Sequence, residues 1–264
     1  MRSSRFQHFP GMIALALSAV ALAFSLHGAP QTEKTTSPAG NAAFTEAQTQ
    51  DIGKISRDYL LANPEVIREA IQALQAKEEA AKTDLQVRAV AKNKDQIFAD
   101  PASPVAGNPK GDVTVVEFFD YKCPYCKQVT PALEGLLKSD PNLKIVFKEF
   151  PILGDPSVLA ARAALAAVRQ DKYLPFHQAM MAHRGTFDLN AIATVAASVG
   201  LNADQLVADM KSDQVDSQLA ANHTLAQALE IRSTPTFIVG DRVVPGALSI
   251  EQLQDLITEA RKGS

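Results

Sequence analysis

The sequence predicts an α/β domain preceded by a helical N-terminal segment. Short apolar runs typical of buried strands lie on both sides of a long helical block, and a stretch of good helix formers with almost no strand signal comes before them. Hydrophobic residues make up 46% of the 264 residues, which is enough for a buried core. No basic excess exists, since 26 basic and 29 acidic residues give a net charge of −3, so we expect no nucleic-acid partner.

The first 29 residues have the composition of a secretory signal peptide. Arg2 and Arg5 are their only charged residues, and an apolar run extends from Met12 to Phe24. That run is too short to favour a membrane span, and the leader has no cysteine for a lipid anchor. Two cleavage positions fit the small-residue pattern, after Ala23 and after Ala29, and an uncleaved anchor is the alternative. The sequence therefore predicts an exported protein.

Residues 30–44 are small and polar and predict a flexible linker, whereas residues 45–99 predict an N-terminal helical segment. Thr45 and Gln48 can form a capping box at the start of a first helix. Asn63-Pro64-Glu65 supplies an N-cap, a first-turn proline and a first-turn acid for a second helix.

Both predicted helices carry apolar residues at three- and four-residue spacing. These residues are Ile52, Ile55 and Tyr59 in the first helix, and Ile67, Ile71 and Leu74 in the second. Two short amphipathic helices cannot bury such stripes alone, so the stripes either pack on the main domain or associate with other copies of the chain. We expect self-association, and we expect Gln75–Asp84, which has little apolar content, to be an exposed helical spacer.

Residues 100–264 predict the main domain, after a boundary rich in proline and glycine. The first expected elements are a short strand at 104–106, a buried strand at 113–119, a helix to about 138 and a second buried strand at 143–147. A helical block follows from an N-cap at Asp155 to about 230, with a helix stop at Gly200 and a new N-cap at Asn202. A hairpin of strands at 236–239 and 242–244 and a helix at 250–260 complete the domain. This order is that of a thioredoxin fold with a helical insertion at about 153–230.

The chemistry is expected at Cys123 and Cys126, the only two cysteines of the chain. A disulfide between them closes too small a loop to stabilise a scaffold much. A CxxC between a buried strand and a helix places the first sulfur at the helix N-terminus, where free N–H groups stabilise a thiolate. Cys123 is therefore the predicted nucleophile and Cys126 the resolving thiol, and the flanking Lys122 and Lys127 are expected to favour the anion further.

A metal site is the alternative use of these cysteines. Zinc needs a second ligand pair, and the histidines that follow the leader, His177, His183 and His223, all lie in the helical block. We therefore expect no zinc and no cofactor. Thiolates are soft ligands, so Cu(I) binding by the reduced pair stays open as a secondary property.

Several motifs in order resemble the bacterial DsbA family of the thioredoxin superfamily. Val115–Cys126 is similar to its active-site segment, Ser233–Phe237 to its cis-proline loop, and Pro131 to the proline that kinks the active-site helix. The resemblance implies a redox-active disulfide between the two cysteines. It also implies substrate contacts from Pro124, Tyr125, Thr234 and Pro235, and a proton relay through the buried acid Glu117.

Each transferred role has an ordinary alternative. Pro235 can be a strand-edge proline in the trans form, and Glu117 can face solvent at a strand end. Asp120 competes with Glu117 for the relay.

Within the family, Tyr59–Ile67 and the Phe119-Asp120-Tyr121 run most resemble the suppressor-of-copper-sensitivity C (ScsC) proteins, some of which have a helical stalk that makes an oligomer. Thr234 is similar to the residue before the cis-proline in disulfide isomerases of the DsbC type. DsbA itself has His where Tyr125 stands and Val where Thr234 stands.

The resemblance implies a periplasmic, homo-oligomeric disulfide isomerase or reductase, with a trimer as one option. It implies exported cysteine-containing proteins as substrates and a membrane redox partner that resets the CxxC. A monomeric dithiol oxidase and a copper-binding protein stay open as alternatives.

Overall fold

The computed structural model describes residues 44–263, in two units that divide after Asn63. The signal peptide and most of the linker predicted for residues 1–44 lie outside the described residues. In the first unit, helix α1 spans Glu46–Ala62. The predicted capping box is confirmed, because the Thr45 side chain accepts from the Gln48 N–H and the Gln48 side chain accepts from the Thr45 N–H. The predicted stripe on α1 is exposed, with Ile55 at 68%.

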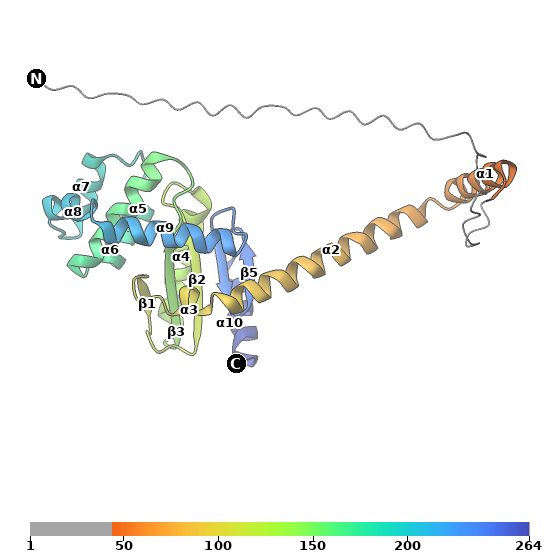
Figure 1. The fold of residues 1–264 in the computed structure, drawn as a ribbon. Helices are drawn as coiled ribbons and strands as arrows, with labels where there is room; N and C mark the ends of the chain where they lie inside the picture. Colours follow the sequence, from red (N-terminus) through yellow and green to blue (C-terminus); the bar gives the residue numbers. More distant parts are fainter. Residues whose placement is uncertain (1–43, 264) are drawn as a thin grey trace, which may run out of the picture. The chain divides into compact units, whose positions relative to one another are not determined.

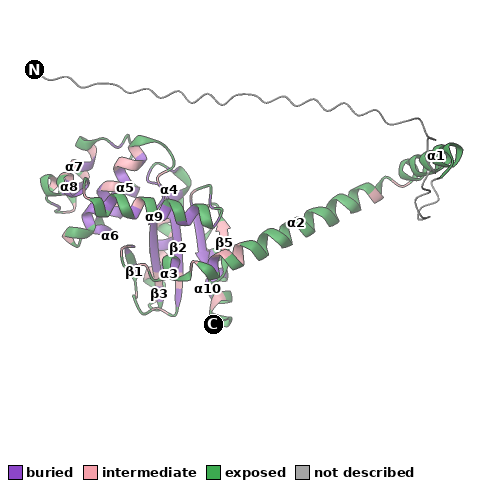
Figure 2. Cartoon of the chain, in the orientation of Figure 1, coloured by how far each residue is buried: buried purple, intermediate pink, exposed green. Residues whose placement is uncertain are grey.

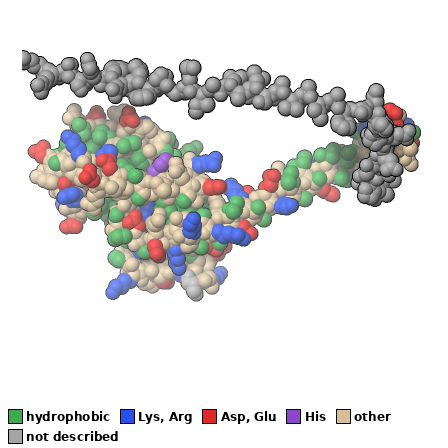
Figure 3. All heavy atoms as spheres, in the orientation of Figure 1, with side chains coloured by type: hydrophobic (Ala, Val, Ile, Leu, Met, Phe, Trp, Pro, Cys, Tyr) green, Lys and Arg blue, Asp and Glu red, His purple; other side chains and the backbone are tan. Residues whose placement is uncertain are grey.

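The second unit begins with α2, Glu65–Lys92, and the short α3, Lys94–Phe98. Most of α2 is exposed, including the predicted spacer, and apolar side chains lie along it among charged ones (Figure 3). The expected N-cap at Asn63 is wrong. Its side chain donates to the Tyr59 carbonyl and so ends α1, while Pro64 occupies the N-cap of α2 without a side-chain hydrogen bond.

A five-stranded sheet forms the centre of the second unit (Figure 1). Its strands are β1 Val105–Gly107, β2 Val113–Phe119, β3 Leu143–Glu149, β4 Thr236–Val239 and β5 Arg242–Pro245. They lie in the order β1-β3-β2-β4-β5, with β2 and β3 parallel and the other pairs antiparallel. The apolar, β-branched run of β2 fits its central place, where side chains on both faces are buried.

Helices cover both faces of the sheet, and the central strands β2, β3 and β4 are buried between them, while the edge strands are more exposed (Figure 2). The helices of this unit that follow β2 are α4 Pro124–Ser139, α5 Asp155–Ala167, the 3-10 turn η1 Val168–Gln170, α6 Tyr173–Ala182, α7 Leu189–Ser198, α8 Ala203–Asp209, α9 Asp213–Ala228 and α10 Ile250–Lys262. Helices α4 and α10 with the insertion helices α5–α8 form a core on one face. The end of α2, α3 and the end of α9 pack on the other, where Val90 and Ile97 meet Val116 and Phe118.

The thioredoxin fold with an inserted helical block is therefore confirmed. Two predicted caps have different outcomes: Asn202 accepts from the Gln205 N–H as expected, but Asp155 is the first residue of α5 and not its N-cap. Gly154 takes that place at φ 93°, a conformation that glycine adopts at little cost. No helix among residues 44–263 is long and apolar enough to cross a membrane.

Candidate active site

The CxxC follows β2 after a turn that Asp120 holds in place. Its Oδ1 accepts from the Lys122 N–H at 2.7 Å, and its Oδ2 accepts from the Ile152 and Leu153 N–H groups at 2.9 and 3.0 Å. The Asp120 carbonyl accepts from the Cys123 N–H at 3.0 Å. Both carboxylate oxygens are thus engaged by backbone donors, so Asp120 fixes the turn and is a poor candidate for the proton relay.

Cys123 is the N-cap residue of α4, with Pro124 in the first turn, as the sequence predicts. Its Sγ lies 3.2 Å from the Thr234 carbonyl oxygen. The Cys123 pKa is lowered to about 5, and the largest cause is the hydrogen bond from the Cys126 thiol. Burial opposes this, whereas the Thr234 side chain and the N–H groups of Tyr125 and Cys126 reinforce it. A thiol at this helix start is therefore ionised at neutral pH.

The two flanking lysines bond to backbone carbonyls away from the first sulfur. Lys122 Nζ donates to the Leu153 carbonyl at 3.0 Å, and Lys127 Nζ donates to the His183 carbonyl at 2.5 Å and lies 5.3 Å from the Phe187 ring centroid. Neither lysine is among the largest causes of the lowered Cys123 pKa. Hydrogen bonding at the helix start is the main stabilisation of the anion.

Cys126 lies in the first turn of α4 and is fully buried. Its pKa is raised, first by burial and then by the Cys123 and Glu117 side chains. Both cysteines are free thiols in this structure. The pair is thus strongly asymmetric, with an anionic first sulfur and a protonated second one.

The predicted cis-proline loop lies against the first sulfur. The Thr234-Pro235 peptide bond is cis, and β4 starts at the next residue. Pro235 is buried, and its carbonyl accepts from the Gly246 N–H at 2.8 Å. On the helix side, Tyr125 is 59% exposed and Pro124 is exposed. The structure thus brings all four predicted substrate-contact residues to the rim of the CxxC.

Glu117 lies on β2 with 1% of its surface exposed, so the solvent-facing alternative is wrong. It shares the α4 face of the sheet with Val115 and Phe119, since side chains alternate along a strand. Among the described residues, its Oε1 has no hydrogen-bond partner. Burial and then the charge on Cys123 raise the Glu117 pKa to about 8.

A second buried acid, Glu149, was not predicted as part of the site. It is the last residue of β3 and lies directly opposite Phe119, so the side chains of both residues point to the α4 face of the sheet. The buried strand was expected to stop at Phe147, and a glutamate beyond it carries no sequence signal that separates it from an exposed loop residue.

Metal ligands do not gather around the cysteines. Within residues 44–263 no group of three or more His, Cys, Asp or Glu side chains could hold a metal ion. His177 is buried and packs on Phe147 and Tyr173, whereas His223 is exposed with its ring beside Phe150.

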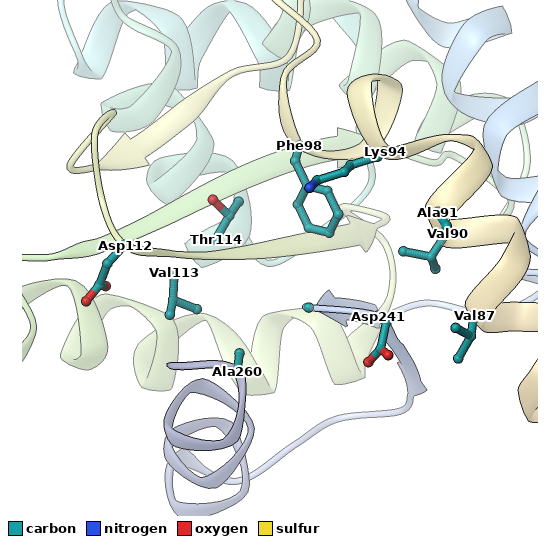
Figure 4. Close-up of a pocket in the computed structure, with 11 residues that line it drawn as sticks. Val87, Val90, Ala91, Lys94, Phe98, Asp112, Val113, Thr114, Asp241 and Ala260 are labelled. Atoms are coloured by element: carbon teal, nitrogen blue, oxygen red, sulfur yellow. The ribbon is translucent and has the colours of Figure 1, made fainter. Parts of the chain in front are cut away.

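A cavity of about 530 Å³ lies elsewhere (Figure 4). It is bounded by the end of α2, by α3, by the start of β2 and by the β4–β5 turn, with Val87, Phe98 and Asp241 among its lining residues. The CxxC follows the other end of β2. This cavity is therefore separate from the thiols.

Comparison with known proteins gives two family matches. The DSBA-like thioredoxin domain matches residues 114–258, which is more than half of the chain, and the copper resistance protein ScsC N-terminal domain matches residues 48–81.

Two solved structures and one curated relative illustrate the similarity. A thioredoxin-like oxidoreductase from Silicibacter pomeroyi is 48% identical with a TM-score of 0.64, over 65% of this chain and 99% of that one. ScsC of Proteus mirabilis is 31% identical with a TM-score of 0.62, over 84% and 100%. The Na(+)/H(+) antiporter NhaA 1 of Salinispora arenicola is 30% identical over 162 residues, 61% of this chain and 25% of the antiporter. The chain thus spans about a quarter of this curated relative's length.

Proposed function

The chain belongs to the family of DsbA-like thioredoxin domains, and we propose on that premise that it is a thiol-disulfide oxidoreductase acting on proteins through Cys123 and Cys126. The observation that carries the proposal is the asymmetry of the two thiols. Cys123 has a pKa of about 5 beside the cis-proline loop, whereas Cys126 is buried with a raised pKa. A thiolate attacks disulfides and a thiol does not, so only one of the two sulfurs is poised to begin the reaction.

The reduced pair can act in two steps. The Cys123 thiolate attacks a substrate disulfide, forms a mixed disulfide and releases one substrate thiolate. Cys126 then loses its proton and attacks Cys123 Sγ, which forms the intramolecular disulfide and releases the second substrate thiolate. Two electrons pass from the dithiol to the substrate, and the reverse sequence oxidises a substrate dithiol.

Glu117 is the group we assign to the proton of Cys126. It is buried, its charge and that of Cys126 disfavour one another, and Cys126 must lose a proton in the second step. A carboxylate with a pKa of about 8 is matched to accept and return a proton near neutral pH.

The substrate contacts are assigned to the rim of the site. The exposed Pro124 and Tyr125 offer an apolar and aromatic surface on one side of Cys123. On the other side, the backbone of Thr234 and Pro235 precedes β4, and an extended substrate segment can run beside it.

We assign isomerase or reductase activity in an oligomer as the finer function, in the periplasm of a bacterium. The exposed stripes of α1 and α2 favour self-association, because contiguous exposed apolar surface marks an interaction site. The match of residues 48–81 to the ScsC N-terminal domain supports the same assignment. Exported proteins with cysteines are the proposed substrates, and a membrane redox partner is proposed to reset the pair.

Refolding of scrambled ribonuclease, measured beside the native mass, tests this function. We expect a multimer that restores ribonuclease activity and a Cys123→Ser variant that does not. A monomer that oxidises reduced ribonuclease but leaves the scrambled form unchanged would support the dithiol oxidase instead. Binding of one Cu(I) per reduced CxxC, without activity on ribonuclease, would support the copper-binding alternative.

A further inference from the structure

Glu149 is a buried acid that the two-step reaction leaves without a role. Its side chain is 1% exposed at the end of β3. Its Oε1 accepts from the Tyr173 hydroxyl at 2.9 Å and from the Tyr121 hydroxyl at 3.2 Å. Its Oε2 has no partner among the described residues. A buried polar group in this setting needs an explanation, because burial without full pairing costs free energy.

The hydrogen bonds of Glu149 connect three parts of the second unit. Tyr121 belongs to the turn before the CxxC, Glu149 to β3, and Tyr173 to α6. The Tyr121 hydroxyl also lies 2.9 Å from Nδ1 of His177, one turn further along α6. The Tyr173 ring is stacked on the His177 ring with centroids 5.6 Å apart. Tyr121 is thus held by its hydroxyl between the sheet and the helical insertion.

The ring of Tyr121 is fixed as firmly as its hydroxyl. It packs edge-on against Phe119 with centroids 5.1 Å apart and lies 6.2 Å from Phe187. Its own residue is 1% exposed and stands two positions before Cys123. A shift of Tyr121 therefore moves the turn that carries the N–H groups and the sulfur at the start of α4.

Within residues 44–263, no cation is among the main groups that act on Glu149. The titratable groups that face it from the neighbouring elements are Glu117, Asp120, Tyr121, Tyr173 and His177. His177 is fully buried, which lowers its pKa to about 3 and keeps the ring neutral. Burial raises the Glu149 pKa well above its usual range. An ionised Glu149 would be an unpaired buried charge, which proteins avoid by keeping the proton.

We propose that Glu149 is a positioning residue for the dithiol chemistry: as a neutral carboxyl it holds the Tyr121 hydroxyl and so fixes the turn from which Cys123 and α4 begin. The proposal rests on the proposed function for its catalytic meaning. Glu117 and Glu149 lie on the same face of adjacent strands, because Glu149 is opposite Phe119 and Phe119 shares a face with Glu117. Since a charge on Glu149 would raise the Glu117 pKa further, a neutral Glu149 leaves Glu117 as the acid that titrates during the reaction.

Three substitutions separate the parts of this proposal. Glu149→Gln keeps a carbonyl oxygen for both tyrosine hydroxyls and cannot ionise, so it copies the neutral acid. Glu149→Leu keeps the bulk and removes the acceptor. Tyr121→Phe removes the hydroxyl that donates to Glu149 and replaces the leucine variant as the test if that variant does not fold.

The first measurement is the thiolate absorbance of Cys123 against pH. We expect Glu149→Gln to keep the wild-type midpoint, and Glu149→Leu and Tyr121→Phe to raise it, the leucine variant by about one pH unit, or tenfold in the thiolate equilibrium. Unchanged midpoints in both of the latter variants would overturn the positioning role. A midpoint displaced as far in Glu149→Gln as in Glu149→Leu would overturn the neutral form.

The second measurement is the melting temperature from pH 5 to pH 8. A raised folded-state pKa means that the folded protein keeps a proton which the unfolded chain releases, so wild-type stability falls as pH rises through this window. We expect the melting temperature of Glu149→Gln relative to wild type to increase with pH. A difference that stays constant or decreases would contradict a neutral Glu149. Both measurements need no substrate, so inactivity of the wild type would refute the proposed function without deciding this inference.

Discussion

The N-terminal helices and the region beneath the CxxC depart from ordinary burial in opposite directions. On α1 and the exposed part of α2, large apolar side chains such as Ile55 and Ile71 face solvent. Under the CxxC, Glu117 and Glu149 are buried without a bonded cation. Both departures cost free energy in an isolated chain, because apolar surface remains exposed to solvent in one region and carboxyl groups are desolvated in the other. Such costs are expected where a partner or a reaction uses the group, so the two regions correspond to the proposed assembly surface and the proposed catalytic site.

The largest expected effect is on the sulfurs themselves. Cys123→Ser removes the nucleophile and should abolish dithiol activity. Cys126→Ser leaves the attacking thiolate without a resolving thiol, so mixed disulfides with substrate proteins should accumulate. Non-reducing gels of the purified variants incubated with disulfide-containing proteins measure this. If Cys126→Ser traps no more partners than Cys123→Ser, the assigned order of attack is wrong.

Glu117→Gln should slow the step in which Cys126 attacks, because the proton of Cys126 loses its acceptor. General-base assistance contributes about 10²- to 10⁴-fold, and the lower figure is the expected loss here. Decay of a preformed mixed disulfide, followed by stopped flow, isolates this step. An unchanged decay rate would remove Glu117 from the proton path.

The same substitution should stabilise the protein as pH rises. The Glu117 pKa is about 8 in the folded protein and 4.5 for an unperturbed glutamate, so the wild type loses stability as the pH rises between these two values. The slope approaches 1.36 kcal/mol per pH unit, and Glu117→Gln removes it. Urea unfolding at pH 5 and pH 8 measures the difference, with Glu134→Gln on α4 as a control for loss of a carboxylate. Equal gains at the two pH values would contradict a buried, protonated Glu117.

On the assembly side, Ile71→Glu should weaken self-association with little effect on folding, because Ile71 is half exposed in α2. Gln72→Glu adds the same charge one residue along the helix and away from the stripe, and should leave the mass unchanged. Sedimentation of both variants tests this. A deletion of the chain through residue 98 would be a poorer test, since it also removes Val90 and Ile97 from the core.

Strands and helices with a clear apolar pattern and clear turn residues at their ends were predicted well from the sequence. Strand β2 has the expected bounds, since its β-branched run stands between a glycine-containing loop and the CxxC. The place of Cys123 and Cys126 at the start of α4 followed from the CxxC spacing, and the cis bond before Pro235 followed from the resemblance of Ser233–Phe237 to a cis-proline loop. Glu149 was missed because its burial depends on α6, which lies far away in the sequence but contributes Tyr173 and His177. The predicted N-cap at Asn63 was wrong for a local reason, because its side-chain amide donates to the Tyr59 carbonyl at the end of the preceding helix.

The smallest expected effect concerns Lys122, whose charge was expected from the sequence to favour the thiolate. Its ammonium donates to the Leu153 carbonyl and is exposed, so solvent and salt screen its field at Cys123. Lys122→Met should therefore shift the Cys123 titration midpoint by less than about 0.3 pH unit, far less than a change at the helix start. The thiolate absorbance of the two proteins, titrated at low and at high salt, measures it. A shift near one unit that disappears in salt would return the lysine to the set of groups that stabilise the anion.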